Sequence, residues 1–211
     1  KVTKKKRQRH PAAPFITSTL QQEAARKLGF STTKTMRVAQ QLYEGVSIDN
    51  ETVGLITYMR TDSVTVSQDA QQAIRQYIKT HYGAHNCPIT PRVYKTKSKN
   101  AQEAHEAIRP TQVNRDLKSL QGALTPEQLK LYKLIWQRTV ASQMIAATFD
   151  TVTLTLSCGT MGLFRANGST LVDPGFIQVY QEGADDAKPS DDEKMLPPLA
   201  EGDRLDIAKL N

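Results

Sequence analysis

The amino-acid sequence predicts an α+β protein: a mainly helical domain with helix-turn-helix-like elements, followed by an incomplete antiparallel β segment. Apolar residues recur at helical spacing up to residue 146, and from residue 147 they alternate with polar residues as in a strand. The charge changes at the same place, because residues 1–146 carry 23 Lys/Arg and 10 Asp/Glu, whereas residues 147–211 carry 5 and 11. We therefore divide the chain into a basic linker or tail at 1–11, a helical domain at 12–146 and a β-rich part at 147–211.

Capping residues and glycine stops predict two helices close together near the start of the helical domain. The first opens with a Ser18–Gln21 capping box and ends at Gly29, and the second runs from Ser31 or Thr32 to Gly45. Two short helices joined so tightly are typical of a helix-turn-helix motif, and equally of a helical hairpin that only packs on a core.

The remaining helical domain predicts further elements of both kinds. Ser67 caps a helix to about Tyr82, and Thr125 with Gln128 opens the helix with the strongest signal. A short helix is expected just before Pro110, since the residue preceding a proline avoids the helical region. A loop at 46–52, a buried strand at 53–59 and mostly irregular chain at 84–100 complete the domain.

The β-rich part is expected to contain a hairpin. Its first strand precedes an Asn167-Gly168 pair that reads as the hairpin turn, and residues 176–180 and 204–210 predict further strands. The acidic stretch at 182–194 is typical of disorder. The two cysteines, Cys87 and Cys158, lie in no CxxC or Cys/His cluster, so the chain offers neither a zinc site nor a disulfide framework.

Composition narrows the setting and the partner. No stretch approaches the roughly 20 apolar residues that a membrane helix needs, so we expect a cytoplasmic protein without a membrane contact. The net charge of +13 on residues 1–146 predicts binding to a polyanion, most simply nucleic acid, through phosphate contacts. The chain begins with Lys1, which suggests a segment of a longer polypeptide.

Three long blocks of sequence carry a family resemblance. They are GLITYMRTDS at Gly54–Ser63, PFITSTLQQEAARKLGFS at Pro14–Ser31 and NAQEAHEAIRPT at Asn100–Thr111. In this order they closely resemble the active-site tyrosine domain of bacterial type IA DNA topoisomerases. The β-rich part is similar, more weakly, to strands of that family's toroidal arch.

The resemblance implies that Tyr58 attacks single-stranded DNA, forms a 5′-phosphotyrosine and relaxes negative supercoils after strand passage. It also implies that magnesium is held by a Toprim module outside this chain, so we expect no metal ligand here and no efficient cleavage by the chain alone. The expected partners are single-stranded DNA and the remaining domains of the same polypeptide, in a monomer.

The residues of the motifs have a physical reading of their own. In a strand Tyr58 and Arg60 share a face, so a guanidinium that can bind a phosphate lies beside the phenol. On a helix His105 and Arg109, four residues apart, share a face and could grip a phosphate. The family's block makes both of them expected DNA contacts. Asp62 is expected either to orient Arg60 or a backbone amide, or simply to cap the turn.

A different class of function is a non-catalytic DNA-binding module in which Tyr58 is structural. This alternative accounts for the charge but not for the three blocks, and a preference for duplex over single strands would favour it. A tyrosine recombinase or type IB enzyme is not supported, because no Arg/His/Arg constellation surrounds a downstream tyrosine.

Overall fold

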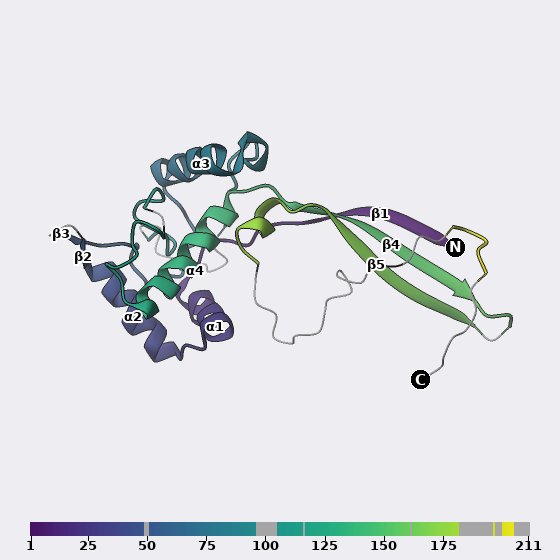
Figure 1. The fold of residues 1–211 in the computed structure, drawn as a ribbon, viewed down its shortest axis with the longest axis horizontal. Coiled ribbons are helices and arrows are strands. Elements are labelled where there is room, and N and C mark those ends of the chain that lie inside the picture. The colour runs from purple at the N-terminus through teal and green to yellow at the C-terminus, as the bar shows by residue number, and fades with distance from the viewer. Residues whose placement is uncertain are drawn as a thin grey trace. The chain divides into compact units, whose positions relative to one another are not determined.

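The computed structural model describes residues 1–48, 51–95, 105–115, 117–160, 162–181, 196 and 200–204. It forms two compact units (Figure 1). The helical unit contains the described residues of 10–146 together with 175–181, and the sheet unit contains the described residues of 1–9, 147–174 and 186–211. None of the helices that the structure describes is long and apolar enough to cross a membrane.

The first two helices are confirmed. Helix α1 spans Thr17–Leu28 and α2 spans Thr32–Glu44. The predicted capping box of α1 is wrong, because the N-cap is Ile16, two residues before Ser18, and the Ile16 N–H donates to Thr19 Oγ1 at 3.0 Å. The cap of α2 is as predicted, with the Lys34 N–H donating to Ser31 Oγ at 3.2 Å.

Helices α3, Gln68–Tyr82, and α4, Pro126–Ser142, are also confirmed, and a short 3-10 turn, η1, follows α3 at Ala84–Asn86. The central helix is α4, which contacts α1, α2 and α3 (Figure 1). It begins with the predicted capping box, in which Thr125 and Gln128 each accept from the other's backbone N–H. Its buried side chains form much of the core, namely Leu131, Tyr132, Ile135, Trp136 and Val140.

The sheet unit corrects the predicted tail. Residues 1–11 are not a tail, because β1, Val2–Arg9, pairs antiparallel with β4, Ala147–Ser157. The strand order is β1-β4-β5 (Figure 1). Residues 2–9 carry no alternation of apolar side chains that would predict a strand, because the lysines of β1 are exposed and pairing through the backbone requires no apolar side chain.

The predicted hairpin turn is also misplaced. Strand β5, Leu163–Asp173, runs straight through Asn167-Gly168, with Gly168 opposite Val152. The chain turns at 158–162 instead, where Gly159 and Gly162 have φ values of 50° and 138°. An Asn-Gly pair permits a turn but does not require one.

Residues after β5 return to the helical unit. The predicted strand at 176–180 is wrong, since Gly175–Gln178 form a 3-10 turn, η2. The Phe176 N–H donates to the Ile145 carbonyl at 3.1 Å, and Phe176, Val179 and Tyr180 are buried. The acidic stretch at 182–194 and all of the predicted strand at 204–210 except Arg204 lie outside the described residues.

A buried polar cluster holds this return segment to α1 and α4. The Tyr180 hydroxyl donates to Glu23 Oε2 at 2.5 Å, and the Arg138 guanidinium lies over the rings of Phe15 and Tyr180. Glu23 is 3% exposed and also pairs with Arg26 at 3.2 Å. Burial and the bond to Glu23 raise the pKa of Tyr180 well above its usual range. The buried carboxylate is therefore compensated by several donors.

Tyr94 ties the start of the helical unit to the end of α4. Its hydroxyl lies 3.0 Å from the Pro11 carbonyl oxygen and 2.9 Å from that of Ser142. Burial raises the pKa of Tyr94 from 10.0 to about 12, although the charges of Arg92 and Arg138 oppose this rise. The neutral phenol is therefore the form that folding favours.

We expect Tyr94→Phe to lower the free energy of unfolding at neutral pH by about 1 kcal/mol, because a buried hydrogen bond is lost. In the wild type the contribution is fully present below pH 10 and is lost as pH rises through about 12. Urea titrations followed by Trp136 fluorescence should therefore show a smaller alkaline loss for Tyr94→Phe. Tyr43→Phe, at an exposed ring, is the control, and equal alkaline losses for wild type and Tyr94→Phe would contradict this prediction.

Candidate active site

The segment that carries Tyr58 is not the predicted strand, because the chain bends at Thr57, Met59 and Arg60. In the stretch at 46–53, expected as a loop and the start of that strand, β2, Val46–Ile48, pairs antiparallel with β3, Glu51–Val53. After β3, Ile56 makes an isolated antiparallel bridge to Pro110. The side chains nevertheless alternate as expected, since Tyr58 is 42% exposed, Arg60 is exposed and Met59 is buried.

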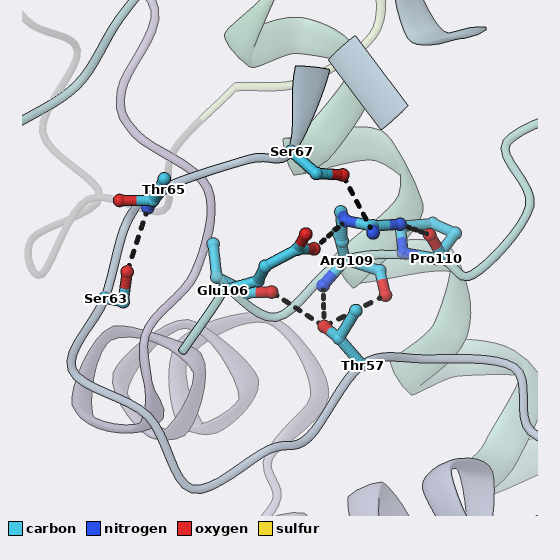
Figure 2. Close-up of polar contacts among 8 residues, drawn as sticks. Thr57, Ser63, Thr65, Ser67, Glu106, Arg109 and Pro110 are labelled. Atoms are coloured by element: carbon cyan, nitrogen blue, oxygen red, sulfur yellow. Dashed lines mark hydrogen bonds and ion pairs between the residues drawn. The ribbon is translucent and has the colours of Figure 1, made fainter. Parts of the chain in front are cut away.

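Thr57 joins this segment to the third sequence block (Figure 2). Its hydroxyl donates to the Ala107 carbonyl at 2.7 Å and accepts from the Arg109 N–H at 3.0 Å. Its own N–H donates to the Arg109 carbonyl at 2.9 Å. The hydroxyl and the backbone of Thr57 thus hold the tyrosine segment against residues 105–111.

The start of α1 holds the other side of the tyrosine segment. The Thr17 hydroxyl donates to the Met59 carbonyl at 2.8 Å and accepts from the Thr61 N–H at 2.9 Å. The Thr17 N–H donates to the Thr61 carbonyl at 2.9 Å. All three sequence blocks therefore meet at the tyrosine.

Arg60 and His105 line the same open concavity, whose volume is about 550 Å³. The His105 ring also lies beside Tyr58, with ring centroids 6.3 Å apart. Neither Arg60 nor Asp62 has a hydrogen bond or ion pair within the described part of the chain. The other residues at its wall are Ile16, Thr17, Ser18, Gln21, Thr61 and Asp62.

Arg109 lies elsewhere, because the predicted helix before Pro110 is wrong over its described part. Residues 105–110 are extended and Ile108 bridges Phe15, while residues 101–104 lie outside the described chain. His105 and Arg109 therefore share no helix face. The Arg109 side chain instead donates to Glu106 at 2.6 Å and to Ser67 at 3.5 Å (Figure 2), and it lines a separate cavity of about 190 Å³.

Asp62 lies at the wall of the concavity, but it contacts neither Arg60 nor a backbone amide among the described residues. Among the described residues it is the only carboxylate at that wall. Across the described residues, no group of three or more His, Cys, Asp or Glu side chains is arranged to hold a metal ion.

Sequence reasoning missed Thr17 and Thr57, whose hydroxyls position the tyrosine. No local signal marks them, because their partners lie about 40 to 50 residues away in the chain. The helical spacing of α2 allowed either Leu42 or Tyr43 as a core position. Leu42 is buried, whereas the Tyr43 ring is 41% exposed and lies 5.3 Å from the Tyr58 ring, centroid to centroid.

The fold and the convergence of the three blocks define a DNA topoisomerase domain. A family model described as DNA topoisomerase matches residues 1–211. DNA topoisomerase 1 from Xylella fastidiosa is 52% identical over 212 residues, which cover 99% of this chain and 26% of that protein. DNA topoisomerase 1 from Rickettsia bellii is 55% identical over 206 residues, which cover 97% and 26%.

A solved structure supports the same assignment. Full-length topoisomerase I from Thermotoga maritima matches with a TM-score of 0.75 and 34% identity, covering 92% of this chain and 31% of that chain. The chain belongs to the bacterial type IA DNA topoisomerase family. It spans about a quarter of the length of the curated relatives that it matches.

We expect Thr57→Val to lower the free energy of unfolding by about 1–3 kcal/mol, because the partners of the hydroxyl are left unpaired. Thr57→Ser keeps the hydroxyl and is the matched control. Chemical denaturation of both variants measures the difference. Equal losses for Val and Ser would show that the methyl group, and not the hydroxyl, holds the segment.

Proposed function

We propose that this chain supplies the nucleophile of a type IA DNA topoisomerase, and that Tyr58 Oη attacks a phosphodiester of single-stranded DNA. The observation that carries the proposal is an exposed Tyr58 beside His105, which shares a concavity with an unpaired Arg60. Family membership supports the same role for the tyrosine. The basic balance of residues 1–146 supports a polyanionic substrate.

The reaction conserves the phosphodiester. A bond forms between Tyr58 Oη and phosphorus while the bond from phosphorus to the 3′ oxygen breaks. The phenol gives up its proton and the leaving 3′ oxygen takes one up, which yields a 5′-phosphotyrosine and a 3′-hydroxyl. Reversal after strand passage restores the DNA, so relaxation of negative supercoils by the full enzyme needs no ATP.

Each residue of the concavity has a proposed part. The guanidinium of Arg60 binds the attacked phosphate and stabilises the charge that develops on it. His105 contacts the phosphate from the side of the Tyr58 ring. Asp62, an exposed carboxylate at the same wall, would pair with Arg60 once DNA orders both side chains. Arg109 could reach DNA only if its bond to Glu106 opens.

The chain alone is proposed to be incomplete. Magnesium would assist the leaving and returning hydroxyl, and its ligands are proposed to lie in a Toprim module outside this chain. We further propose that the enzyme is a cytoplasmic monomer whose remaining domains complete the site.

We expect the chain alone, incubated with single-stranded DNA and magnesium, to give almost no covalent complex. The full-length polypeptide should give abundant complex, and Tyr58→Phe should abolish it, because the nucleophilic oxygen is absent. Denaturing gels of end-labelled DNA measure the complex. Cleavage that survives Tyr58→Phe would overturn the nucleophile assignment, and abundant complex with the chain alone would overturn its incompleteness.

We expect Arg60→Gln to weaken the binding of single-stranded DNA. The slope of the logarithm of the binding constant against the logarithm of salt concentration should become shallower by about 0.7, the value for one phosphate contact. Its stability should not change, because Arg60 has no partner in the described part of the chain. Arg109→Gln is the matched comparison. It should reduce stability through Glu106, and an unchanged salt slope for it would remove Arg109 from the DNA contacts.

A further inference from the structure

Two large aromatic rings are exposed in the described part of the helical unit, and they contact each other. Tyr43 is 41% exposed and Tyr58 is 42% exposed. Their ring centroids lie 5.3 Å apart with an interplanar angle of 63°, an edge-to-face pair. Tyr43 therefore retains ring surface open to solvent directly beside the proposed nucleophile.

The backbone holds Tyr43 in place. It lies in the last turn of α2, where the Leu55 N–H donates to the Leu42 carbonyl at 2.7 Å. Gly54 approaches so closely that a Cβ there would lie 2.8 Å from the Tyr43 carbonyl oxygen. The last turn of α2 and the segment that carries Tyr58 are therefore fixed to each other, and both rings occupy defined positions.

The exposed part of the Tyr43 ring contributes no buried apolar surface to the core. The neighbouring Glu44 accepts from Gln40 Nε2 at 2.7 Å, and among the described residues the Tyr43 hydroxyl has no hydrogen-bond partner. An exposed aromatic ring beside the proposed nucleophile is suited to stack an unpaired base of single-stranded DNA, because base–aromatic stacking is a common mode of single-strand binding.

We propose that Tyr43 is a base-stacking residue, on which a nucleobase next to the phosphate attacked by Tyr58 packs its face. The ligand is an unpaired base of single-stranded DNA, and the inference rests on the proposed function. Stacking on Tyr43 would set the register of the strand, while Arg60 holds its phosphate. Every base has a ring face, so Tyr43 would provide affinity with little sequence preference.

The test uses the full-length polypeptide with Tyr58→Phe, which prevents cleavage. Oligothymidylates that carry one 2-aminopurine, moved along the strand position by position, report stacking by fluorescence quenching. Tyr43→Leu should abolish quenching at one position and weaken binding about tenfold. Tyr43→Phe should keep both within about twofold, because the ring remains. Gln40→Leu, one turn earlier on the exposed side of α2, is the matched control and should change neither.

The outcomes separate this inference from the proposed function. If Tyr43→Leu retains binding and quenching, or if Tyr43→Phe loses as much as Tyr43→Leu, stacking on the ring is overturned. Slower cleavage by Tyr43→Leu in the Tyr58 background, with binding and quenching unchanged, would make Tyr43 only a support for the nucleophile and would also overturn it. Tyr43→Trp, expected to retain quenching, decides the matter should Tyr43→Leu fail to fold. Absence of a covalent complex in the wild type overturns the proposed function instead.

Discussion

The position of Tyr58 depends on backbone hydrogen bonds that join three distant stretches of chain. Thr57 pairs with the chain at Arg109, and Thr17 pairs with Met59 and Thr61. Most of the donors and acceptors belong to the backbone, so the geometry is rigid although no regular sheet forms there. The Met59 side chain is buried in the core, whereas the side chain of the preceding residue, Tyr58, is exposed to solvent. A nucleophile held in this way loses little freedom when DNA binds.

A second constraint acts on α1, whose first turn forms part of the concavity wall. The buried Glu23 accepts a hydrogen bond from the Tyr180 hydroxyl. The Arg138 guanidinium donates to that same hydroxyl and, at 2.6 Å, to the Ala13 carbonyl. Removing one member of such a cluster leaves another buried group without its partner, which is costly. The return segment after β5 therefore supports the helix that carries Thr17, and so indirectly supports the site.

The arginines of the helical unit fall into two groups, one available to bind phosphate and one engaged in structural interactions. Arg60 is exposed and unpaired among the described residues, whereas Arg109 is bonded to Glu106 and Arg138 is buried against aromatic rings. An arginine whose donors are unused can bind a phosphate without first breaking an existing interaction. The exposed lysines of β1 act differently, because charges along an edge strand discourage pairing with another chain.

The sequence by itself determined the four long helices, because caps and helical periodicity are local properties. Only the tertiary structure decided that residues 2–9 form a strand, that the chain turns at 158–162, and that residues 105–110 are extended. These outcomes depend on partners tens to more than a hundred residues away, such as β4 for β1 and Phe15 for Ile108. Where distant backbone groups offer hydrogen bonds, local helix propensity does not decide the structure. For this reason residues 105–110 form no helix, and Arg109 and His105 do not share the predicted helix face.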